Sequence, residues 1–434
     1  MKRGSKQRRA LSTQGKGKFA REGDESLSRS LVDAFRAATD KEAAVSLTHP
    51  IHTYPARLHP GTARILVKLA AELVGNRRSR LSVVDPFCGG GTVLVETAFG
   101  GGLAAGVDAN PLAVSIARAK TWHGTERQRD QVLRMAGQLT RTAIDEGRAA
   151  RRSGYEAPPP RAPRGVNANA RNKQLSNWFP PHVRRELECL AAGVEAVKDP
   201  GQRNLLTVAL SSVLYKVSYR ASDTDKSRVK RNIGRGQAAR LFGDRAQLLC
   251  DGLAELAKTA PRDRVNIYHG DARKLSAIPL PDRVDAVITS PPYAGTYDYV
   301  DHHKLRMDFL GYSSSQFAAD EIGSRGSFNG DAKTRNAALE RFERDLGTSM
   351  AQMAKIVRPG GMIAMVIGDS LAGGRAVYAD EVVARIAPRY GELVARAAQT
   401  RPTFGAGESR AFAKRSKWEH MILIKTKKPA KVKR

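Results

Sequence analysis

The ten residues VVDPFCGGGT, Val83 to Thr92, join a short apolar stretch to a helical pattern through three glycines. The apolar stretch LSVVD, which ends at Asp85, is typical of a buried strand, and TVLVETAF after the glycines has helical periodicity. Glycines let the backbone turn tightly and approach a ligand closely. The first turn of a helix also offers unpaired N–H groups. This strand–loop–helix unit predicts a ligand site at the end of a strand in an α/β protein.

Two familiar glycine loops do not fit this stretch. A phosphate-binding loop needs Gly-Lys-Ser/Thr, but Thr92 is preceded by Gly91. A dinucleotide fingerprint needs a further glycine where Leu94 stands. What remains is a glycine loop with an acid, Asp85, at the tip of its strand.

Short apolar strands alternate with helical runs on both sides of the insertion described below. Residues 60–120 read helix, strand, helix, strand, helix, and five further strand candidates follow residue 263. The alternation predicts a mostly parallel, seven-stranded sheet with helices on both faces, that is, a Rossmann-like α/β fold. The five later strand candidates are VNIYHGDA, VDAVITS, GGMIAMVIGDS, ELVARAAQT and HMILIKT.

The same pattern divides the chain into five segments. Residues 49–121 and 263–427 form one α/β domain, which a mostly helical insertion, 122–262, interrupts. Residues 1–48 carry eight Lys or Arg before their first acid and predict a largely disordered basic tail. A binding arm and a merely solubilising end both fit that tail. Residues 428–434 form a second basic tail.

The charge of the chain points to a polyanion. There are 73 Lys and Arg against 43 Asp and Glu, a net charge of +30, which favours nucleic acid as partner. No long uncharged apolar run argues for a membrane, and no signal peptide is evident, so we expect a cytoplasmic, nucleoid-associated protein. The three cysteines are scattered without zinc-site spacing, and no metal is expected. No pattern indicates the oligomeric state.

An aspartate stands at the end of each of three strand candidates. Asp85 precedes the glycine loop, Asp108 ends GVDANP and Asp271 lies in HGDAR. Ligands of open α/β sheets bind at these carboxyl ends, where an acid can hold ribose hydroxyls or accept from an adenine amine. A strand-end Asp is also often a helix cap, but three of them at consecutive strands favour a ligand.

The stretch ITSPPYAGTYDY ends another strand candidate in Ser-Pro-Pro-Tyr. Pro291 and Pro292 fix two φ angles and remove two N–H donors, so that nearby carbonyls remain available as acceptors. Ser290 adds a hydroxyl and Tyr293 an aromatic face. Such a rigid acceptor cluster suits a planar ligand with an amino group, although Pro-Pro often only ends a strand.

Together, DPFCGGGT (85–92) and SPPY (290–293) resemble the paired signature of S-adenosylmethionine-dependent amino-methyltransferases, which methylate exocyclic amines of DNA bases. The stretch HPIHTYPARLHP, from His49, resembles the segment that closes over the methionine end of the cofactor in that family. The resemblance covers roughly 49–121 and 263–427. The serine form is similar to the N4-cytosine group.

The resemblance implies S-adenosyl-L-methionine as cofactor, and a DNA base that is flipped out of the duplex as substrate. It implies that four residues of the catalytic motif hold the base: Ser290, Pro291, Pro292 and Tyr293. It implies a cofactor set around the methionine part, the ribose and the adenine, in this order: Asp85, Phe87, Gly89 and Gly91; Asp108; Asp271.

Other reactions fit less well. Adenine-N6 enzymes usually have Asp or Asn where Ser290 stands, and related RNA methyltransferases often carry an N-terminal RNA-binding domain, for which 1–48 is too short. Methylation at cytosine C5 needs a Cys nucleophile, but Cys88 lies inside the glycine loop. A non-catalytic nucleic-acid-binding protein would be expected to lose the glycines or the Pro-Pro-Tyr, and both are intact. No nuclease-like motif stands out, which favours a stand-alone enzyme over a restriction-modification pair.

The insertion contains the basic stretch KVSYRASDTDKSRVKRNIGRGQAAR, from Lys216. Phosphate contacts and a solvated charged loop fit it equally well. Its position matches that of the DNA-recognition region in some DNA methyltransferases. The predicted nucleic-acid-binding residues are Lys226, Arg228, Lys230, Arg231 and Arg235.

Overall fold

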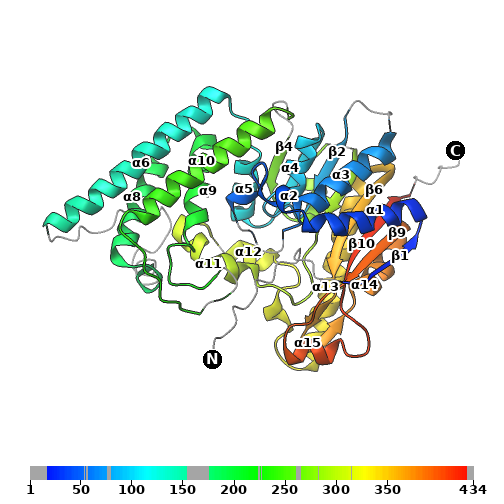
Figure 1. Ribbon diagram of the computed structural model, residues 1–434. Helices are drawn as coiled ribbons and strands as arrows, with labels where there is room; N and C mark the ends of the chain where they lie inside the picture. The colour runs from blue at the N-terminus through cyan, green and yellow to red at the C-terminus, as the bar shows by residue number, and fades with distance from the viewer. Residues whose placement is uncertain are drawn as a thin grey trace.

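The structure, a computed structural model, consists of a twisted sheet covered by helices and a group of long helices beside it (Figure 1). In the described part of the chain, no helix is both long and apolar enough to cross a membrane. The structure describes residues 17–52, 54, 57–75, 80–153, 175–222, 225, 227–260, 265–281, 283–313 and 315–427.

Eight strands form the main sheet, in the order β1-β9-β10-β6-β5-β2-β3-β4. The chain runs outward from β2 to β4, returns to β5 beside β2 and then continues to the other edge. This is a Rossmann-like order, with its switch point between β2 and β5. The five parallel strands are β2 (Ser82–Asp85), β3 (Leu103–Asp108), β4 (Val265–His269), β5 (Val284–Thr289) and β6 (Val357–Gly368).

The remaining strands pair in antiparallel fashion. β10 (Trp418–Thr426) lies between β6 and β9 (Gly391–Thr400) and runs antiparallel to both. β1 (Phe19–Gly23) adds an edge strand to β9. The predicted fold class and all seven predicted strands are confirmed, and β1 is an addition that the sequence did not indicate.

Helices cover both faces of the sheet because its strands are apolar on both sides. On β2, Val83 packs with one group of helices and Val84 with the other. The first group is α1 (Glu25–Arg36), α3 (Pro60–Val74) and α4 (Thr92–Phe99), and the second is α13 (Ala332–Ile356) and α14 (Ala379–Ile386). Helix α5 (Pro111–Lys120) packs on β3 and β4.

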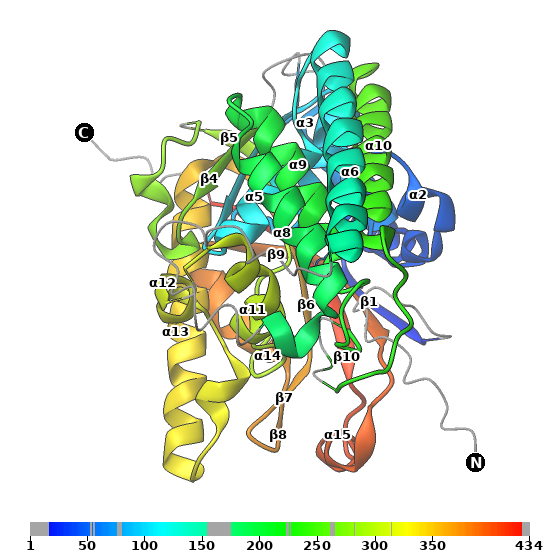
Figure 2. The ribbon, with the colours of Figure 1, turned by 90° about the vertical axis from the view of Figure 1, so that its left-hand side faces the viewer.

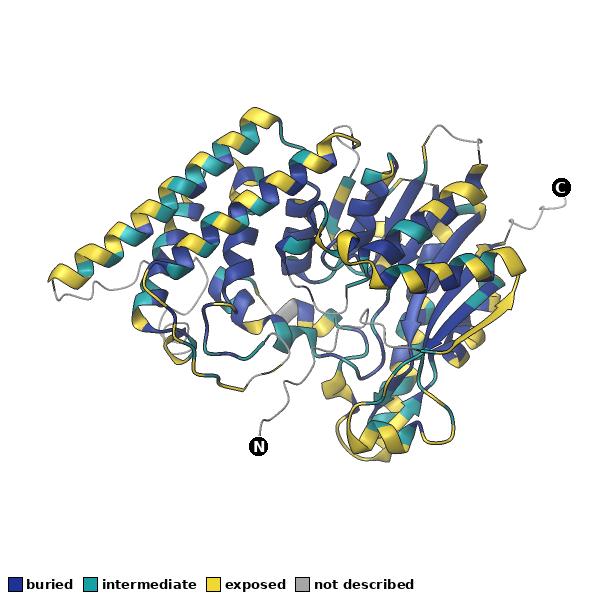
Figure 3. Cartoon of the chain, in the orientation of Figure 1, coloured by how far each residue is buried: buried dark blue, intermediate teal, exposed yellow. Residues whose placement is uncertain are grey.

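The insertion folds against α5. Leu112 and Ile116 of α5 share one apolar core with the insertion helices and with Leu305 and Phe309 of α11 (Tyr299–Leu310). The insertion helices have buried inner faces and exposed outer faces (Figure 3). The prediction of a mostly helical segment agrees with α6 (Glu126–Ser153), α8 (Pro181–Glu195), α9 (Pro200–Val213) and α10 (Gln237–Ala257).

Several short elements lie beyond the carboxyl edge of the sheet (Figure 2). The hairpin of β7 (Ser370–Ala372) and β8 (Arg375–Val377) lies near α15 (Gly405–Ala411) and the start of α13. The short helices α2 (Lys41–Val45) and α12 (Ser315–Asp320) connect larger elements.

The prediction of a disordered tail over residues 1–48 is wrong for its described part. β1 pairs with β9 over five residues, and Asp24 caps α1 by accepting from the Leu27 N–H at 3.0 Å. Leu31 and Phe35 of α1 are fully buried. Their spacing of four residues gives α1 an apolar face that packs on the sheet. Residues 17–48 carry five Lys or Arg against six Asp or Glu, so charge repulsion does not oppose this packing.

Phe35→Ala tests whether this segment is part of the fold. Truncating a fully buried Phe is expected to lower the free energy of unfolding by about 3–5 kcal/mol. Val45→Ala is the control, because Val45 is 67% exposed, and it should change the value by less than about 0.5 kcal/mol. Urea denaturation measures both. Equal midpoints for the two variants would mean that residues 17–45 do not pack on the sheet.

Candidate active site

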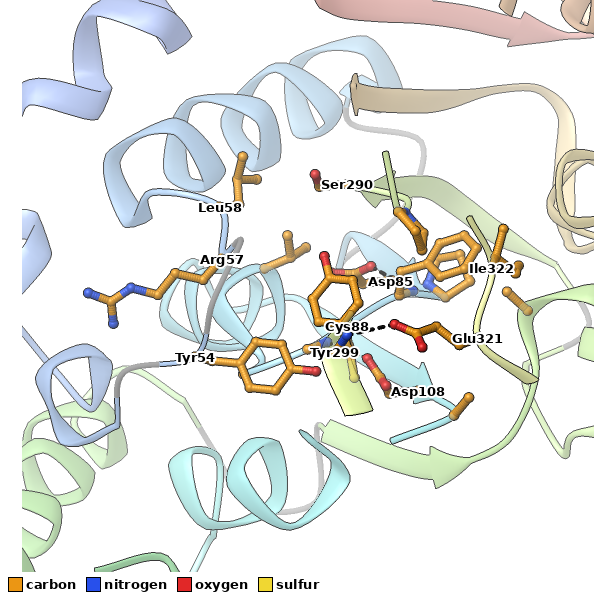
Figure 4. A pocket seen from close by; sticks show the side chains of 18 of the residues that line it. Tyr54, Arg57, Leu58, Asp85, Cys88, Asp108, Ser290, Tyr299, Glu321 and Ile322 are labelled. Atoms are coloured by element: carbon orange, nitrogen blue, oxygen red, sulfur yellow. Dashed lines mark hydrogen bonds between the residues drawn. The ribbon is translucent and has the colours of Figure 1, made fainter. Parts of the chain in front are cut away.

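A cavity lies at the carboxyl ends of β2, β3 and β5. It encloses about 860 Å³ including its open mouth. Its walls come from the glycine loop, the segment before α3, the loop after β5 and the residues around α12 (Figure 4). In Figure 4, Ser290 and Asp108 lie on opposite sides of Asp85 and Tyr299, and all four residues line the cavity.

Most of the predicted site residues meet in this one cavity. Of the residues predicted for the cofactor site and the catalytic motif, Gly91, Pro291 and Tyr293 do not line the cavity. The predicted residues that line it are Asp85, Phe87, Gly89, Asp108, Asp271, Ser290 and Pro292.

The three glycines have different tasks. Gly89 has a positive φ of 48°, and its N–H donates to Asp108 Oδ2 at 2.8 Å. A Cβ at Gly89 would lie 3.1 Å from the Tyr54 ring, and one at Gly90 would lie 3.3 Å from the same side chain. At Gly91, φ is 75° and a Cβ would lie 3.0 Å from Ala117. The first two glycines therefore admit Tyr54, whereas Gly91 lets α4 pack closely against α5.

Two of the three strand-end acids, Asp85, which is buried, and Asp108, which is half-buried, are reluctant to ionise. Asp85 accepts from the Thr289 hydroxyl at 2.6 Å and from the Phe87 N–H at 3.1 Å, yet burial raises its pKa to about 7. Asp108 accepts from the Gly89 N–H and the Asn110 N–H, each at 2.8 Å, and burial raises its pKa to about 6. Each carboxylate still has lone pairs for a ligand.

The third acid is already paired. Asp271 accepts from Arg273 Nε at 2.9 Å, and Arg273 also approaches Asp345 at 3.2 Å. Asp271 caps the following turn through the Arg273 N–H at 2.8 Å. Asp271 therefore caps a turn, as the alternative interpretation expected, and it also lines the cavity. The predicted contact of Asp271 with adenine stays a prediction.

The Ser-Pro-Pro-Tyr motif splits between the cavity and the core. Tyr293 is 6% exposed, and its hydroxyl donates to Glu419 Oε1 at 3.1 Å. Burial raises the pKa of Tyr293, and a hydrogen bond with the Ser290 side chain opposes this rise. Glu419 also forms an ion pair with Arg401. The ring supports the loop from the core, so its predicted contact with a base stays a prediction.

Residues that the sequence analysis did not single out complete the wall. Tyr54 and Arg57 come from the segment before the glycine loop, which the resemblance had marked as a whole. The Tyr54 hydroxyl accepts from Asn110 Nδ2 at 3.2 Å. Glu321 accepts from the Tyr299 N–H at 2.6 Å, and burial raises its pKa to about 7. No local pattern marked Glu321.

The predicted nucleic-acid contacts in the insertion are only partly available. Arg231 donates to the Tyr215 carbonyl at 2.7 Å and to the Ala221 carbonyl at 3.0 Å, so it holds its own loop together. Arg228 lies over the Tyr219 ring at 4.9 Å. Lys226 lies outside the described residues, whereas Arg228, Lys230 and Arg235 are exposed.

One group of potential metal ligands lies outside the cavity. Asp369, Asp380 and His420 bring ligand atoms within 4.8 Å of one another. Arg396 and Arg415 pair with Asp380 at 2.7 and 2.5 Å. These guanidinium groups already supply the positive charge that the acid needs, which fits an ion-pair network between β6, β10 and α14.

Comparisons with known proteins agree on the domain type. Residues 51–149 match a family model described as an RMKL-like methyltransferase domain. The match is to a methyltransferase domain. A curated relative, the type II methyltransferase M.MvaI of Kocuria varians, is 37% identical over 75 residues, which is 17% of this chain and 16% of the relative. The chain thus matches about a sixth of that relative's length.

Two solved structures resemble this chain at 12% sequence identity. TrmN from Thermus thermophilus aligns with a TM-score of 0.32 over 85% of this chain and 49% of its own. The rRNA methyltransferase aviRa from Streptomyces viridochromogenes aligns with a TM-score of 0.33 over 89% of this chain and 93% of its own.

The raised pKa of Asp108 gives a testable pH dependence. Because the pKa of Asp108 in the folded protein, about 6, exceeds the ordinary value of 3.8, the fold favours the protonated carboxyl, and stability should fall as pH rises from 4 to 7. Relative to Asp108→Asn, the wild type should lose about 2–3 kcal/mol over this window. Denaturant titrations at several pH values measure it. Asp145→Asn, on an exposed helix face, should follow the wild type, and parallel curves for all three proteins would contradict the assignment.

Proposed function

We propose that this chain is an S-adenosyl-L-methionine-dependent methyltransferase that methylates the exocyclic amine of a flipped-out DNA base, namely N4 of cytosine. The observation that carries the proposal is that one cavity joins the glycine loop and the strand-end acids to Ser290 and Pro292. The matched methyltransferase domain model and the type II methyltransferase relative support it.

The residues of the cavity fit this cofactor chemically. The buried Asp85 and the half-buried Asp108 have no cationic partner in the described hydrogen bonds, and a sulfonium would favour their charged forms. Asp108 can accept from ribose hydroxyls. The Thr92 hydroxyl is buried and without a hydrogen-bond partner among the described residues, and it lines the cavity. The Thr92 hydroxyl suits the carboxylate of the methionine part, whereas the Arg57 guanidinium points away from the cavity in Figure 4 and donates to the His49 carbonyl at 2.9 Å.

The chain's own groups can prepare the amine for attack. When bound, the cofactor supplies an electrophilic methyl group. The Tyr293 hydroxyl donates its hydrogen bond to Glu419 Oε1, so it does not donate to Ser290. The Ser290 oxygen keeps its lone pairs, and it can accept an N–H of the amine. Such an acceptor stabilises the positive charge that develops on nitrogen and holds the nitrogen in line.

Other substrates remain as outcomes of the test. N6 of adenine and base amines of RNA could use the same acceptor cluster. Methylation at C5 is disfavoured because burial raises the pKa of the Cys88 thiol, which keeps it protonated and unreactive. A non-catalytic protein on this fold would bind nucleic acid without transfer.

A transfer assay separates these outcomes. The protein is incubated with labelled S-adenosylmethionine and either DNA or RNA of varied sequence, and the products are digested to nucleosides. We expect label in N4-methylcytosine from DNA, with N6-methyladenine as the second candidate. Label only in RNA would replace the substrate, and no transfer to either polymer would refute the proposal.

Ser290→Ala tests the acceptor. Removing a group that acts mainly in the transition state is expected to lower kcat on the order of 10- to 100-fold and to leave cofactor affinity unchanged. Single-turnover rates and calorimetry measure the two quantities. Ser327→Ala, at an exposed serine outside the cavity wall, is the matched control. A Ser290→Ala protein with wild-type kcat would show that its hydroxyl is not the acceptor.

A further inference from the structure

A second cavity lies on the other side of the loop that follows β5. It encloses about 1130 Å³ including open solvent. Gly295 and Thr296 line this second cavity, whereas Ser290 and Pro292 of the same loop line the first. The β7–β8 hairpin, the start of α13 and the segment around α15 form the rest of its wall, in the group of elements beyond the sheet edge in Figure 2.

The second cavity carries an excess of positive charge. Three cations line it, Arg325, Arg335 and Lys417, against one acid, Glu408. Lys417 pairs with Glu408 at 3.1 Å. The salt bridges of the described residues include none to Arg325 or Arg335, although the charge of Arg325 helps to lower the pKa of Asp298 and that of Arg335 the pKa of Asp331.

Both unpaired arginines are held in place by backbone carbonyls. Arg325 Nη2 donates to the Thr296 carbonyl, and Arg335 Nη1 donates to the Gly330 carbonyl at 2.6 Å. The Nε of Arg335 is buried without a partner among the described residues. A guanidinium fixed at one nitrogen keeps its other donors in a defined orientation, which suits the oxygens of a phosphate group.

The cavity also has space and an aromatic edge. A Cβ at Gly374 would meet nothing within 4 Å, so the hairpin turn leaves room beside it. Phe404 is 44% exposed at the rim. Cations that follow a backbone together with an exposed aromatic ring are the combination that single strands of nucleic acid use.

We propose that the second cavity binds the phosphodiester backbone of the strand whose target base enters the first cavity. The inference rests on the proposed function and adds the place where the substrate strand lies. Because Arg325 donates to the Thr296 carbonyl, a phosphate bound there would also stabilise the loop that presents Ser290. The loop after β5 would then take part both in binding the strand and in positioning the base.

Arg335→Gln tests the proposal with a matched control. The control, Arg344→Gln, removes the same charge from an exposed position of α13 outside the cavity. Binding is measured by fluorescence anisotropy over a range of salt, with duplex DNA, single-stranded DNA and RNA of one sequence. We expect Arg335→Gln to weaken binding about 10-fold and to lower the salt slope by about one ion, with Arg344→Gln close to wild type. Comparison of the three affinities shows whether duplex DNA, single-stranded DNA or RNA binds most tightly.

Asn329→Asp provides a second variant that keeps the size of the side chain. Asn329 is exposed on the cavity wall, and a negative charge there should weaken binding to a similar extent. Wild-type affinity and salt slope in both Arg335→Gln and Asn329→Asp would overturn the inference, and would leave the function intact if the wild type transfers methyl groups. Weakened binding in a protein that transfers none would refute the function and keep the cavity assignment. A wild type that binds no polymer would overturn both.

Discussion

The hydrogen bond from the Thr289 hydroxyl to Asp85 Oδ1, at 2.6 Å, ties the two halves of the site together. Asp85 ends β2 and starts the glycine loop, and Thr289 ends β5 directly before Ser290. The two residues are 204 positions apart and meet only because β5 returns to the side of β2. Every proposed step of transfer depends on this adjacency, since it places a cofactor loop and an acceptor motif around one cavity.

The insertion affects the site through contacts and not only through its position in the chain. Tyr54 lies against Gly89 and Gly90 and stacks on His303 of α11, with ring centroids 4.7 Å apart. Tyr54 also belongs to the apolar core of the insertion helices. A change in the packing of those helices therefore reaches the glycine loop through one aromatic ring. This is a physical route by which a change in the insertion can affect the cofactor loop.

The elements with strong local patterns were predictable. Seven strands followed from short apolar runs between turns, and Asp85, Asp108 and Ser290 followed from their positions at strand ends. The edge strand β1 and helix α1 were missed because the eight Lys and Arg before Glu22 decided the interpretation of the whole segment, although Leu31 and Phe35 have helical spacing. Sequence patterns show only the neighbours of a residue along the chain. Contacts between distant segments can change the structure that those local patterns predict.

Long-range placement explains the other differences. Tyr293 turns toward Glu419, a residue 126 positions away, and no local signal announces that contact. Arg231 looked like a phosphate contact, but it closes its own loop through backbone carbonyls. No local pattern singled out Arg335. Its proposed role in binding phosphate depends on the second cavity, which the start of α13 and the β7–β8 hairpin line together. Net charge predicts nucleic acid as the partner, which stays a prediction, whereas the fold decides which of the charged side chains are available.

The most direct test of the central claim is a crystal structure with S-adenosylhomocysteine bound. The account predicts that the ligand lies in the first cavity, with its ribose hydroxyls on the Asp108 carboxylate and its sulfur directed toward Ser290. A ligand bound with its ribose away from Asp108, or with its sulfur directed away from Ser290, would contradict the account.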